Sequence, residues 1–199
     1  NIINKSNIRK RYRECCILTI RYNGGMKIAI TDVETTGLLA EKHEIIEIGA
    51  VIFDDQTFEI LDTIDVKIKP EHIEDADPIA LQVNGYNIDD WKDAVPLSDA
   101  MRIYSEKTSG CMFCAHNMIF DFGFMEQAFK KVGLENKFDK HRIDIFTLAW
   151  SKIPHDKIPK WSLKTICEYL EIPPEPVVHR GINGAMAEYQ VYKKLMQKI

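Results

Sequence analysis

The sequence predicts an α/β fold in which helices pack on the faces of a mixed β-sheet. Three strand-like segments follow one another closely in the first half of the chain, and strand-like and helix-like segments then alternate toward its end. Consecutive strands with short connections pair antiparallel, whereas strands joined through a helix pair parallel. The chain of 199 residues is long enough for one domain of this kind with an appendage.

The first three strands are expected at residues 26–34, 44–55 and 59–70. Each segment is rich in β-branched residues, and apolar and polar side chains alternate along MKIAITDVE, as in a strand with one buried face. Because the connections between these segments are short, we expect them to form an antiparallel meander.

The rest of the chain contains one further buried strand, CMFCAHN, among segments whose apolar residues have helical spacing. Stop signals at Ser109-Gly110 and Gly133 end two of these segments. The predicted helices span residues 79–85, 99–110, 121–134, 161–172 and 184–199. This alternation predicts that parallel strands extend the meander.

The pair Cys111 and Cys114 has the CxxC spacing of a redox or zinc site. Residues three apart on a strand point to opposite faces, however, and no second pair completes a zinc site. The five cysteines are an odd number, so a disulfide framework is not expected. We expect Cys111 and Cys114 to be buried, unreactive thiols.

Charge divides the chain near residue 25. Residues 1–25 contain six Lys or Arg and one Glu, whereas the whole chain has a formal net charge of −4. One interpretation is a basic arm that binds nucleic acid. The interpretation favoured here is a basic extension upstream of a start at Met26, not native to the folded domain at residues 26–199.

Composition also limits the class of protein. Hydrophobic residues make up 45% and charged residues 28% of the chain, as in an ordinary globular protein. No apolar run approaches the roughly 18 residues that a membrane span needs. We therefore expect a cytoplasmic protein that does not bind a membrane.

The first motif that carries chemistry is TDVETTGL, residues 31–38. Asp32 and Glu34 are two apart on a strand, so both carboxylates project from the same face. Adjacent carboxylates repel each other, and a divalent cation between them removes that cost. Hard oxygen ligands suit Mg²⁺ or Mn²⁺. A pair of solvated strand residues is the alternative, which we would prefer if the motif stood alone.

The second motif is AHNMIFDFGFM, residues 115–125. Here a buried strand ends in His116-Asn117, and Asp121 opens a helix. Residues just past strand ends and at helix starts line the ligand crevice of an α/β sheet. The alternative role for Asp121 is a helix N-cap, which is common for aspartate. The two roles are compatible.

Together with HRGINGAMAEYQVYKKL, residues 179–195, these motifs resemble the DEDDh 3′-to-5′ exonucleases. This superfamily includes the proofreading (epsilon) subunit of bacterial DNA polymerase III, ribonuclease T and oligoribonuclease. The resemblance runs from Met26 to the C-terminus and includes VNGYNIDDW, residues 83–91. It implies a ribonuclease H-like fold with a five-stranded mixed sheet flanked by helices. It also implies two metal ions, Mg²⁺ or Mn²⁺, acting on a phosphodiester bond at a 3′ end.

The resemblance also implies roles for individual residues. Asp32 would bridge both metals, Glu34 would bind the first, and Asp121 would hold the second. His179 matches the general base, a role that suits an imidazole because much of it is neutral near pH 7. The implied substrate-binding residues are Thr35, Thr36, Gly37, Leu38, His116, Asn117, Phe120 and Phe124. For the two phenylalanines a core position is an equally good interpretation.

One position departs from the family pattern, which requires a carboxylate five residues after the histidine. This sequence has Gly184 there. Asn183 is one position early, which rotates a helical side chain by ~100°, and the Cβ of Glu188 starts about 6 Å too far along the axis. Losing a group that only supports a metal ligand costs roughly 10- to 100-fold. We therefore expect strongly reduced activity, partly rescued by high Mn²⁺.

Residues 137–164 bear on the substrate, because they contain seven Lys or Arg and three Asp, with Phe146, Trp150 and Trp161 among them. Basic residues with stacking aromatics suit single-stranded nucleic acid, and a solvated face with core aromatics is the alternative. We expect single-stranded DNA 3′ ends rather than RNA, in proofreading or repair beside a DNA polymerase. A non-cutting end-binding or polymerase-associated module and an RNA-trimming exoribonuclease remain as alternatives.

Overall fold

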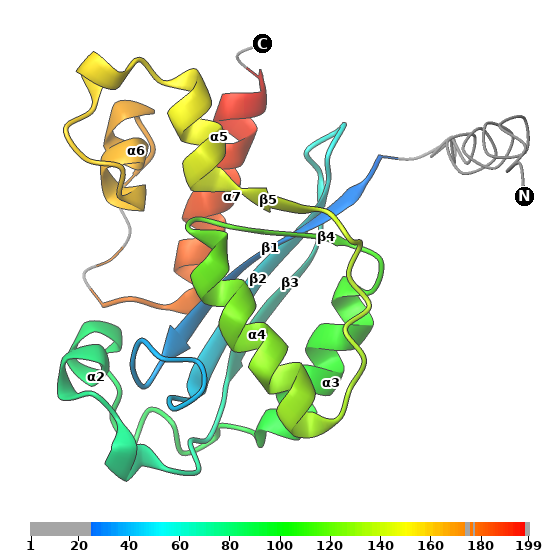
Figure 1. Ribbon diagram of the computed structural model, residues 1–199, viewed down its shortest axis with the longest axis vertical. Helices are drawn as coiled ribbons and strands as arrows, with labels where there is room; N and C mark the ends of the chain where they lie inside the picture. The colour runs from blue at the N-terminus through cyan, green and yellow to red at the C-terminus, as the bar shows by residue number, and fades with distance from the viewer. Residues whose placement is uncertain (1–24, 174–175, 177, 198–199) are drawn as a thin grey trace, which may run out of the picture.

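The computed structural model describes residues 25–173, 176 and 178–197 (Figure 1). Within them, one five-stranded sheet has the strand order β3-β2-β1-β4-β5. The predicted α/β fold with a mixed sheet is therefore confirmed. The predicted basic extension at residues 1–25 lies outside the described residues, apart from Gly25.

The pairing of the strands follows the lengths of their connections. Strand β1 pairs with β2, and β2 with β3, in antiparallel fashion, which is the predicted meander. Strand β4 then runs parallel to β1, and β5 runs parallel to β4, to which a helix connects it. The strands are β1 (Lys27–Thr35), β2 (Ile45–Asp54), β3 (Ile60–Lys67), β4 (Met112–Ala115) and β5 (Arg142–Asp144).

Two groups of helices cover the sheet, with α3 and α4 on one face and α5, α6 and α7 on the other (Figure 1). No helix in the described part of the chain is long and apolar enough to cross a lipid bilayer. The helices are α2 (Pro78–Asn84), α3 (Leu97–Thr108), α4 (Met118–Val132), α5 (Ile145–Lys152), α6 (Leu163–Tyr169) and α7 (Gly181–Gln197), with 3-10 turns η1 (Ile73–Asp75) and η2 (His155–Lys157).

Strand alternation separates the core into two clusters. On β1, Ile30 packs with α7 on one face, whereas Val33 packs with α4 on the other. Cys111 and Cys114 also lie in different clusters, and both are buried and free. Burial raises the pKa of both thiols. The prediction that Cys111 and Cys114 are buried on opposite faces of the sheet is confirmed, and the raised pKa values accord with the expected low reactivity.

The start of α7 lies directly on β2, backbone against backbone. A Cβ on Gly181 would lie 2.6 Å from the backbone nitrogen of Gly49, and a Cβ on Gly49 would overlap the backbone of Gly181. Only glycine at both positions permits this approach. The close contact places the first turn of α7 at the level of Asp32, whose backbone oxygen would lie 2.9 Å from a Cβ on Gly181.

Four helices begin earlier than the sequence predicts, and the largest shifts, three residues each, are at α4 and α7. Helix α7 begins at Gly181 rather than residue 184, because Glu47 supplies an acceptor for the first backbone amide. Helix α4 begins at Met118, with Asn117 as the N-cap in the left-handed region at φ 61°. Asp121 therefore lies in the first turn of α4, so the alternative role considered for it, that of helix N-cap, belongs to Asn117 instead.

Candidate active site

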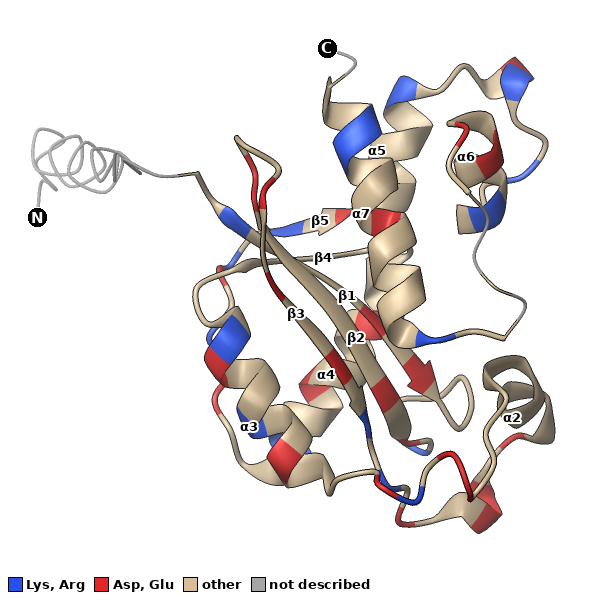
Figure 2. Cartoon of the chain, turned by 180° about the vertical axis from the view of Figure 1, so that it is seen from behind, with Lys and Arg blue, Asp and Glu red and all other residues tan. Residues whose placement is uncertain are grey.

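The predicted metal ligands lie where β1 ends and where α4 and α7 begin. Asp32 and Glu34 share the face of β1 that carries Ile30, which is the face covered by α7. Acidic residues on β1, β2 and α4 gather near this end of the sheet (Figure 2). Glu34 is buried and Asp32 is half-buried. The spacing of two along the strand thus places both carboxylates as the sequence predicts.

Asp121 reaches the same place from α4. Strand β4 pairs with β1 only as far as Ile30, so it provides no acceptor beside Val33. The backbone amide of Val33 instead donates to Asp121 Oδ1 at 3.1 Å. Burial raises the pKa of Asp121 to about 7, and the negative charge of Glu34 adds to the effect, while the Val33 hydrogen bond opposes it.

These carboxylates fit a divalent cation by their chemistry. They supply hard oxygen donors, and a cation would offset the burial and repulsion that favour the protonated form of Asp121. Among the residues that the structure describes, no three His, Cys, Asp or Glu side chains already converge into a metal cluster. Asp32, Glu34 and Asp121 are the residues that could hold the ion.

Gly184 faces this carboxylate site from the first turns of α7. A Cβ on Gly184 would lie 2.8 Å from Asp32 Cγ and would overlap Asp32 Oδ2. A side chain at position 184 would therefore point at the Asp32 carboxylate on β1. The Asp32 carboxylate occupies the space where a side chain at position 184 would begin. The three carboxylates thus fit a divalent cation, and position 184 contributes no oxygen donor from a side chain.

Glu188 lies one turn beyond Gly184 on the same face of α7. It is 2% exposed and lines the same cavity as Asp32 and Gly184. Helical side chains lean toward the N-terminus, so the carboxylate of Glu188 is directed back along α7.

His179 precedes α7 and is exposed. Its backbone amide donates to the Val83 oxygen at 3.4 Å. The next residue, Arg180, donates to the Asn84 oxygen at 2.5 Å, and its guanidinium lies 5.2 Å from the ring centroid of Trp91. Contacts with the VNGYNIDDW segment therefore hold the part of the chain that carries His179 in position.

Two cavities meet at Asp32 and His179, which line both. The smaller, about 310 Å³, also includes the apolar side chains Leu38, Ile79 and Phe120. The larger, about 850 Å³, continues along α6 and α7. Further residues that line the larger cavity are His116, Ser162, Leu163, Lys164, Cys167, Glu168, Gly184, Ala187 and Glu188.

The loop after β1 positions its predicted substrate-binding residues in different ways. Leu38 is 73% exposed and faces the smaller cavity. The Thr35 hydroxyl donates to the Gly37 oxygen at 2.7 Å, and the Thr36 hydroxyl accepts from the Glu44 amide at 2.9 Å. Both hydroxyls thus shape the loop. A Cβ on Gly37 would lie 2.5 Å from the ring of His43, so a side chain there would displace that ring.

The predicted substrate-binding residues just after β4 and on α4 fall into two groups, those that line a cavity and those that do not. Phe120 lines the smaller cavity, whereas Phe124 is buried in the core beneath it, with ring centroids 5.0 Å apart. His116 lines the larger cavity. The Asn117 backbone amide donates to Asp144 Oδ1 at 3.0 Å. Phe120 and His116 therefore face the cavities, and Phe124 supports Phe120.

Three residues that hold the site were not found from the sequence. Glu47 Oε1 accepts from the Gly181 amide at 3.0 Å, and burial raises the pKa of Glu47. Arg180 and Asp144 fasten the chain before α7 and the start of α4. One signal was available for Glu47, because a glutamate inside the apolar run IIEIGAVIF is unlike a solvated residue.

Comparison with protein families matches residues 29–192 to the family model described as Exonuclease. A DNA polymerase III PolC-type protein of Listeria welshimeri is 34% identical over 168 residues, which cover 84% of this chain and 11% of that protein. One from Caldanaerobacter subterraneus is 28% identical over 180 residues, covering 87% and 12%. The chain therefore corresponds to about one eighth or less of these curated relatives.

Solved structures share the fold at lower sequence identity. Escherichia coli exonuclease I in complex with a dT13 oligonucleotide has a TM-score of 0.73 and 16% identity, covering 86% of this chain and 41% of that one. The nuclease domain of 3′hExo, a DEDDh family member bound to rAMP, has a TM-score of 0.70 and 20% identity, covering 89% and 94%. The expected ribonuclease H-like fold is confirmed.

Proposed function

Because the chain belongs to the Exonuclease family and to its DEDDh superfamily of 3′-to-5′ exonucleases, we propose that it hydrolyses the terminal phosphodiester bond at 3′ ends of single-stranded DNA. The observation that carries this proposal is the meeting of the two cavities at Asp32 and His179. A strand whose scissile phosphate lies at that junction has space for nucleotides on both sides.

The carboxylates and the histidine have different roles in the proposed reaction. Asp32, Glu34 and Asp121 would hold two ions, Mg²⁺ or Mn²⁺. Such ions lower the pKa of bound water and stabilise negative charge on the leaving oxygen. His179 is exposed at the mouth of both cavities, where it takes the proton from the attacking water. The His179 backbone amide and the Arg180 side chain donate to backbone oxygens of α2, and these contacts hold the segment that carries the imidazole near this water.

Gly184 lowers the activity in this proposal. Position 184 faces Asp32, and without a carboxylate there the cation loses one charged ligand. Loss of a group that merely supports a ligand costs roughly 10- to 100-fold in affinity or activity, and loss of a ligand itself costs more. The chain is therefore expected to cut slowly in Mg²⁺.

The relatives supply the argument for the substrate and the partner. The curated relatives are DNA polymerase III proteins, and one solved neighbour holds a dT13 oligonucleotide. We extend this to a single-stranded DNA substrate and association with a DNA polymerase, in proofreading or repair. In the smaller cavity, Leu38 and Phe120 would contact the terminal nucleotide.

The test is the shortening of a 5′-labelled single-stranded DNA in Mg²⁺ and in Mn²⁺. The expected result is a ladder of shortened products that grows from the 3′ end and is absent for Asp32→Ala. A DNA with a 3′-phosphorothioate terminal linkage should resist, because the first bond cut is the terminal one. Products that begin as internal fragments, or equal cutting by Asp32→Ala, would contradict the proposal. An RNA of the same sequence measures sugar preference.

A second candidate function is supported by Gly184 alone. A domain that has lost one carboxylate would bind 3′ ends without cutting them, as an end-binding or polymerase-associated module. In that case the labelled DNA binds with a preference for a free 3′ hydroxyl, and no ladder forms in either metal. The shortening assay and a binding assay on the same DNA therefore separate the two functions.

A further inference from the structure

Four rings form a cluster on the connection from α5 through η2 to α6. They are Phe146 and Trp150 on α5, His155 on η2, and Trp161 before α6, and we call them the aromatic platform. The ring centroids of Trp150 and Trp161 are 4.7 Å apart, and those of Trp150 and His155 are 4.2 Å apart. Contacts with Phe146 at 6.0 and 6.3 Å complete the cluster.

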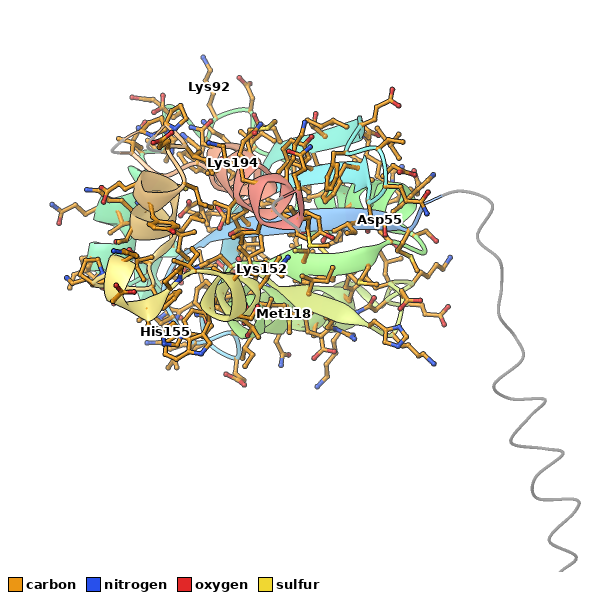
Figure 3. The ribbon with its side chains drawn as sticks, turned by 90° about the horizontal axis from the view of Figure 1, so that it is seen from above. Asp55, Lys92, Met118, Lys152, His155 and Lys194 are labelled. Atoms are coloured by element: carbon orange, nitrogen blue, oxygen red, sulfur yellow. The ribbon has the colours of Figure 1, made fainter. Side chains whose placement is uncertain are left out.

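Core packing accounts for only one side of this platform. Trp161 is half-buried and packs against the core beneath α5, α6 and α7. Trp150, in contrast, is 45% exposed, and His155 projects from the edge of the molecule (Figure 3). A hydrogen bond at 3.1 Å joins the His155 ring to the Trp150 backbone oxygen. The exposed ring surface is thus held in place before any ligand arrives.

His116 connects the platform to the active site. Its ring lines the larger cavity together with Asp32 and His179. Its Nε2 makes a 3.1 Å hydrogen bond with the Trp161 backbone oxygen, and its centroid is 6.4 Å from that of Phe146. Burial lowers the pKa of His116, so the ring is neutral near pH 7. The platform therefore begins where the wall of the catalytic cavity ends.

The charge around the platform suits a phosphate backbone. Lys160 and Lys164 are exposed on either side of Trp161, and Lys164 also lines the larger cavity. Figure 2 shows basic segments on α6 and on the connection that leads to it. The neighbouring Lys157 is 3.5 Å from Asp156, so that pair adds little net charge. Glu168 also lines the cavity, so the cationic side of the path is the one at Trp161.

We propose that the aromatic platform binds the nucleotides on the 5′ side of the scissile phosphate of a single-stranded nucleic acid. This inference rests on the proposed function. The 3′-terminal nucleotide lies in the smaller cavity, the strand crosses Asp32 and passes His116, and its bases stack on Trp150 and Trp161. Lys160 and Lys164 contact the phosphates. Stacking on aromatic rings tolerates any base sequence and requires unpaired bases.

The experiment measures binding of 5′-labelled oligonucleotides of 3 and 15 nucleotides, with Ca²⁺ in place of Mg²⁺ and the uncut length verified on a gel. Trp150→Ala should weaken the 15-mer about tenfold, because one stacked base is lost, and should leave the trinucleotide within about twofold. The pair Lys160→Gln and Lys164→Gln should reduce the salt slope for the 15-mer by about 1.4, since each contact with a single strand contributes about 0.7.

A matched control is the pair Lys92→Gln and Lys130→Gln. Both lysines are exposed, Lys92 lies across the molecule from His155 (Figure 3), and Lys130 is on α4 over the other face of the sheet. The salt slope should not change for this pair. Tryptophan fluorescence gives a second readout, because two of the three tryptophans belong to the platform. The 15-mer should quench it, and the trinucleotide should not.

The outcomes separate this inference from the proposed function. The platform proposal is contradicted if the two lysine pairs change the salt slope equally, or if the 15-mer binds Trp150→Ala as tightly as it binds the parent. The proposed nuclease function still stands in that case, provided that the trinucleotide binds and the labelled DNA is shortened. If neither oligonucleotide binds and no shortening occurs, both proposals fail. DNA and RNA 15-mers of one sequence measure which sugar the platform prefers.

Discussion

The β1–α4 half of the site and its α7 half differ in how their chemical groups are fixed. On β1, Asp32 and Glu34 are set by the strand, and Asp121 is tied to the Val33 amide of the same strand. On α7, the position that faces Asp32 is Gly184, and His179 lies outside the helix. The β1–α4 half carries three carboxylates, whereas α7 presents Gly184 and Glu188 to the larger cavity and His179 lies just before the helix.

The difference shows that α7 is anchored independently of the missing ligand. Gly49 and Gly181 meet backbone to backbone, and Glu47 accepts from the Gly181 amide. None of these contacts involves a side chain at position 184. The contacts that anchor α7 are therefore independent of the residue at position 184. The following predictions test this contrast between the two halves.

The largest effect is expected from His179→Ala in a chain that also carries Gly184→Asp. A positioned base contributes about 10²- to 10⁴-fold to the rate, so the rate of shortening should fall by that factor. The exposed position means that the unfolding midpoint should hardly change. Single-turnover rates on labelled DNA provide the measurement. A loss below about threefold would show that another group takes the proton.

The second effect concerns how the free energy of unfolding depends on pH when no metal is bound, through Asp121 in the β1–α4 half. The pKa of Asp121 is raised from 3.8 to about 7, so the folded state binds more protons than the unfolded chain between these values. The stabilisation from the protonated form is complete below about pH 4 and is lost as pH rises through about 7. The pKa difference of about 3 corresponds to on the order of 4 kcal/mol.

Asp121→Asn should remove this dependence, because the amide oxygen can still accept from Val33 and cannot ionise. In EDTA the free energy of unfolding of the variant should increase relative to that of the parent as pH rises from 5 to 8, as measured by urea unfolding. Added Mn²⁺ at pH 8 should stabilise the parent more than the variant. Parallel pH profiles for the two chains would show that Asp121 ionises as in water.

A smaller effect tests the anchoring of α7. Gly49→Ala places a Cβ against the backbone of Gly181, which cannot move as a side chain can. Overpacking of this kind costs about 1–3 kcal/mol, measured by urea unfolding. Gly123→Ala on α4 is the matched control, because a Cβ there meets nothing within 4 Å. Its free energy of unfolding should rise by roughly 0.5–1 kcal/mol, since alanine is favoured over glycine inside a helix. Equal behaviour of the two variants would refute the close anchoring.

Periodicity and spacing predicted the parts of the fold and site that depend on short stretches of chain. The meander follows from β-branched alternation, and the shared face of Asp32 and Glu34 follows from a spacing of two residues. The CxxC pair was assigned to opposite faces by the same rule. These features need no knowledge of distant contacts.

The parts that were missed depend on contacts between distant segments. Glu47 accepts from an amide 134 residues away, and Arg180 donates to an oxygen 96 residues away. The place of Asp121 within α4 depends on where the helix begins, which local patterns define poorly. These contacts and helix starts are determined by tertiary packing, and no local sequence motif predicts them.

The measurement that tests the central claim most directly compares the parent chain with Gly184→Asp and with Gly184→Asn, which adds the same volume without a charge. Each is assayed for shortening of 5′-labelled single-stranded DNA across a titration of Mg²⁺ and Mn²⁺. The returned carboxylate requires the flexible Asp32 side chain to turn, and a cation between the two offsets their repulsion. We predict that Gly184→Asp raises the Mg²⁺ rate about 100-fold or more and lowers the cation concentration needed, while Gly184→Asn does neither. A parent chain that already cuts as fast as Gly184→Asp would contradict the claim that residue 184 limits this nuclease.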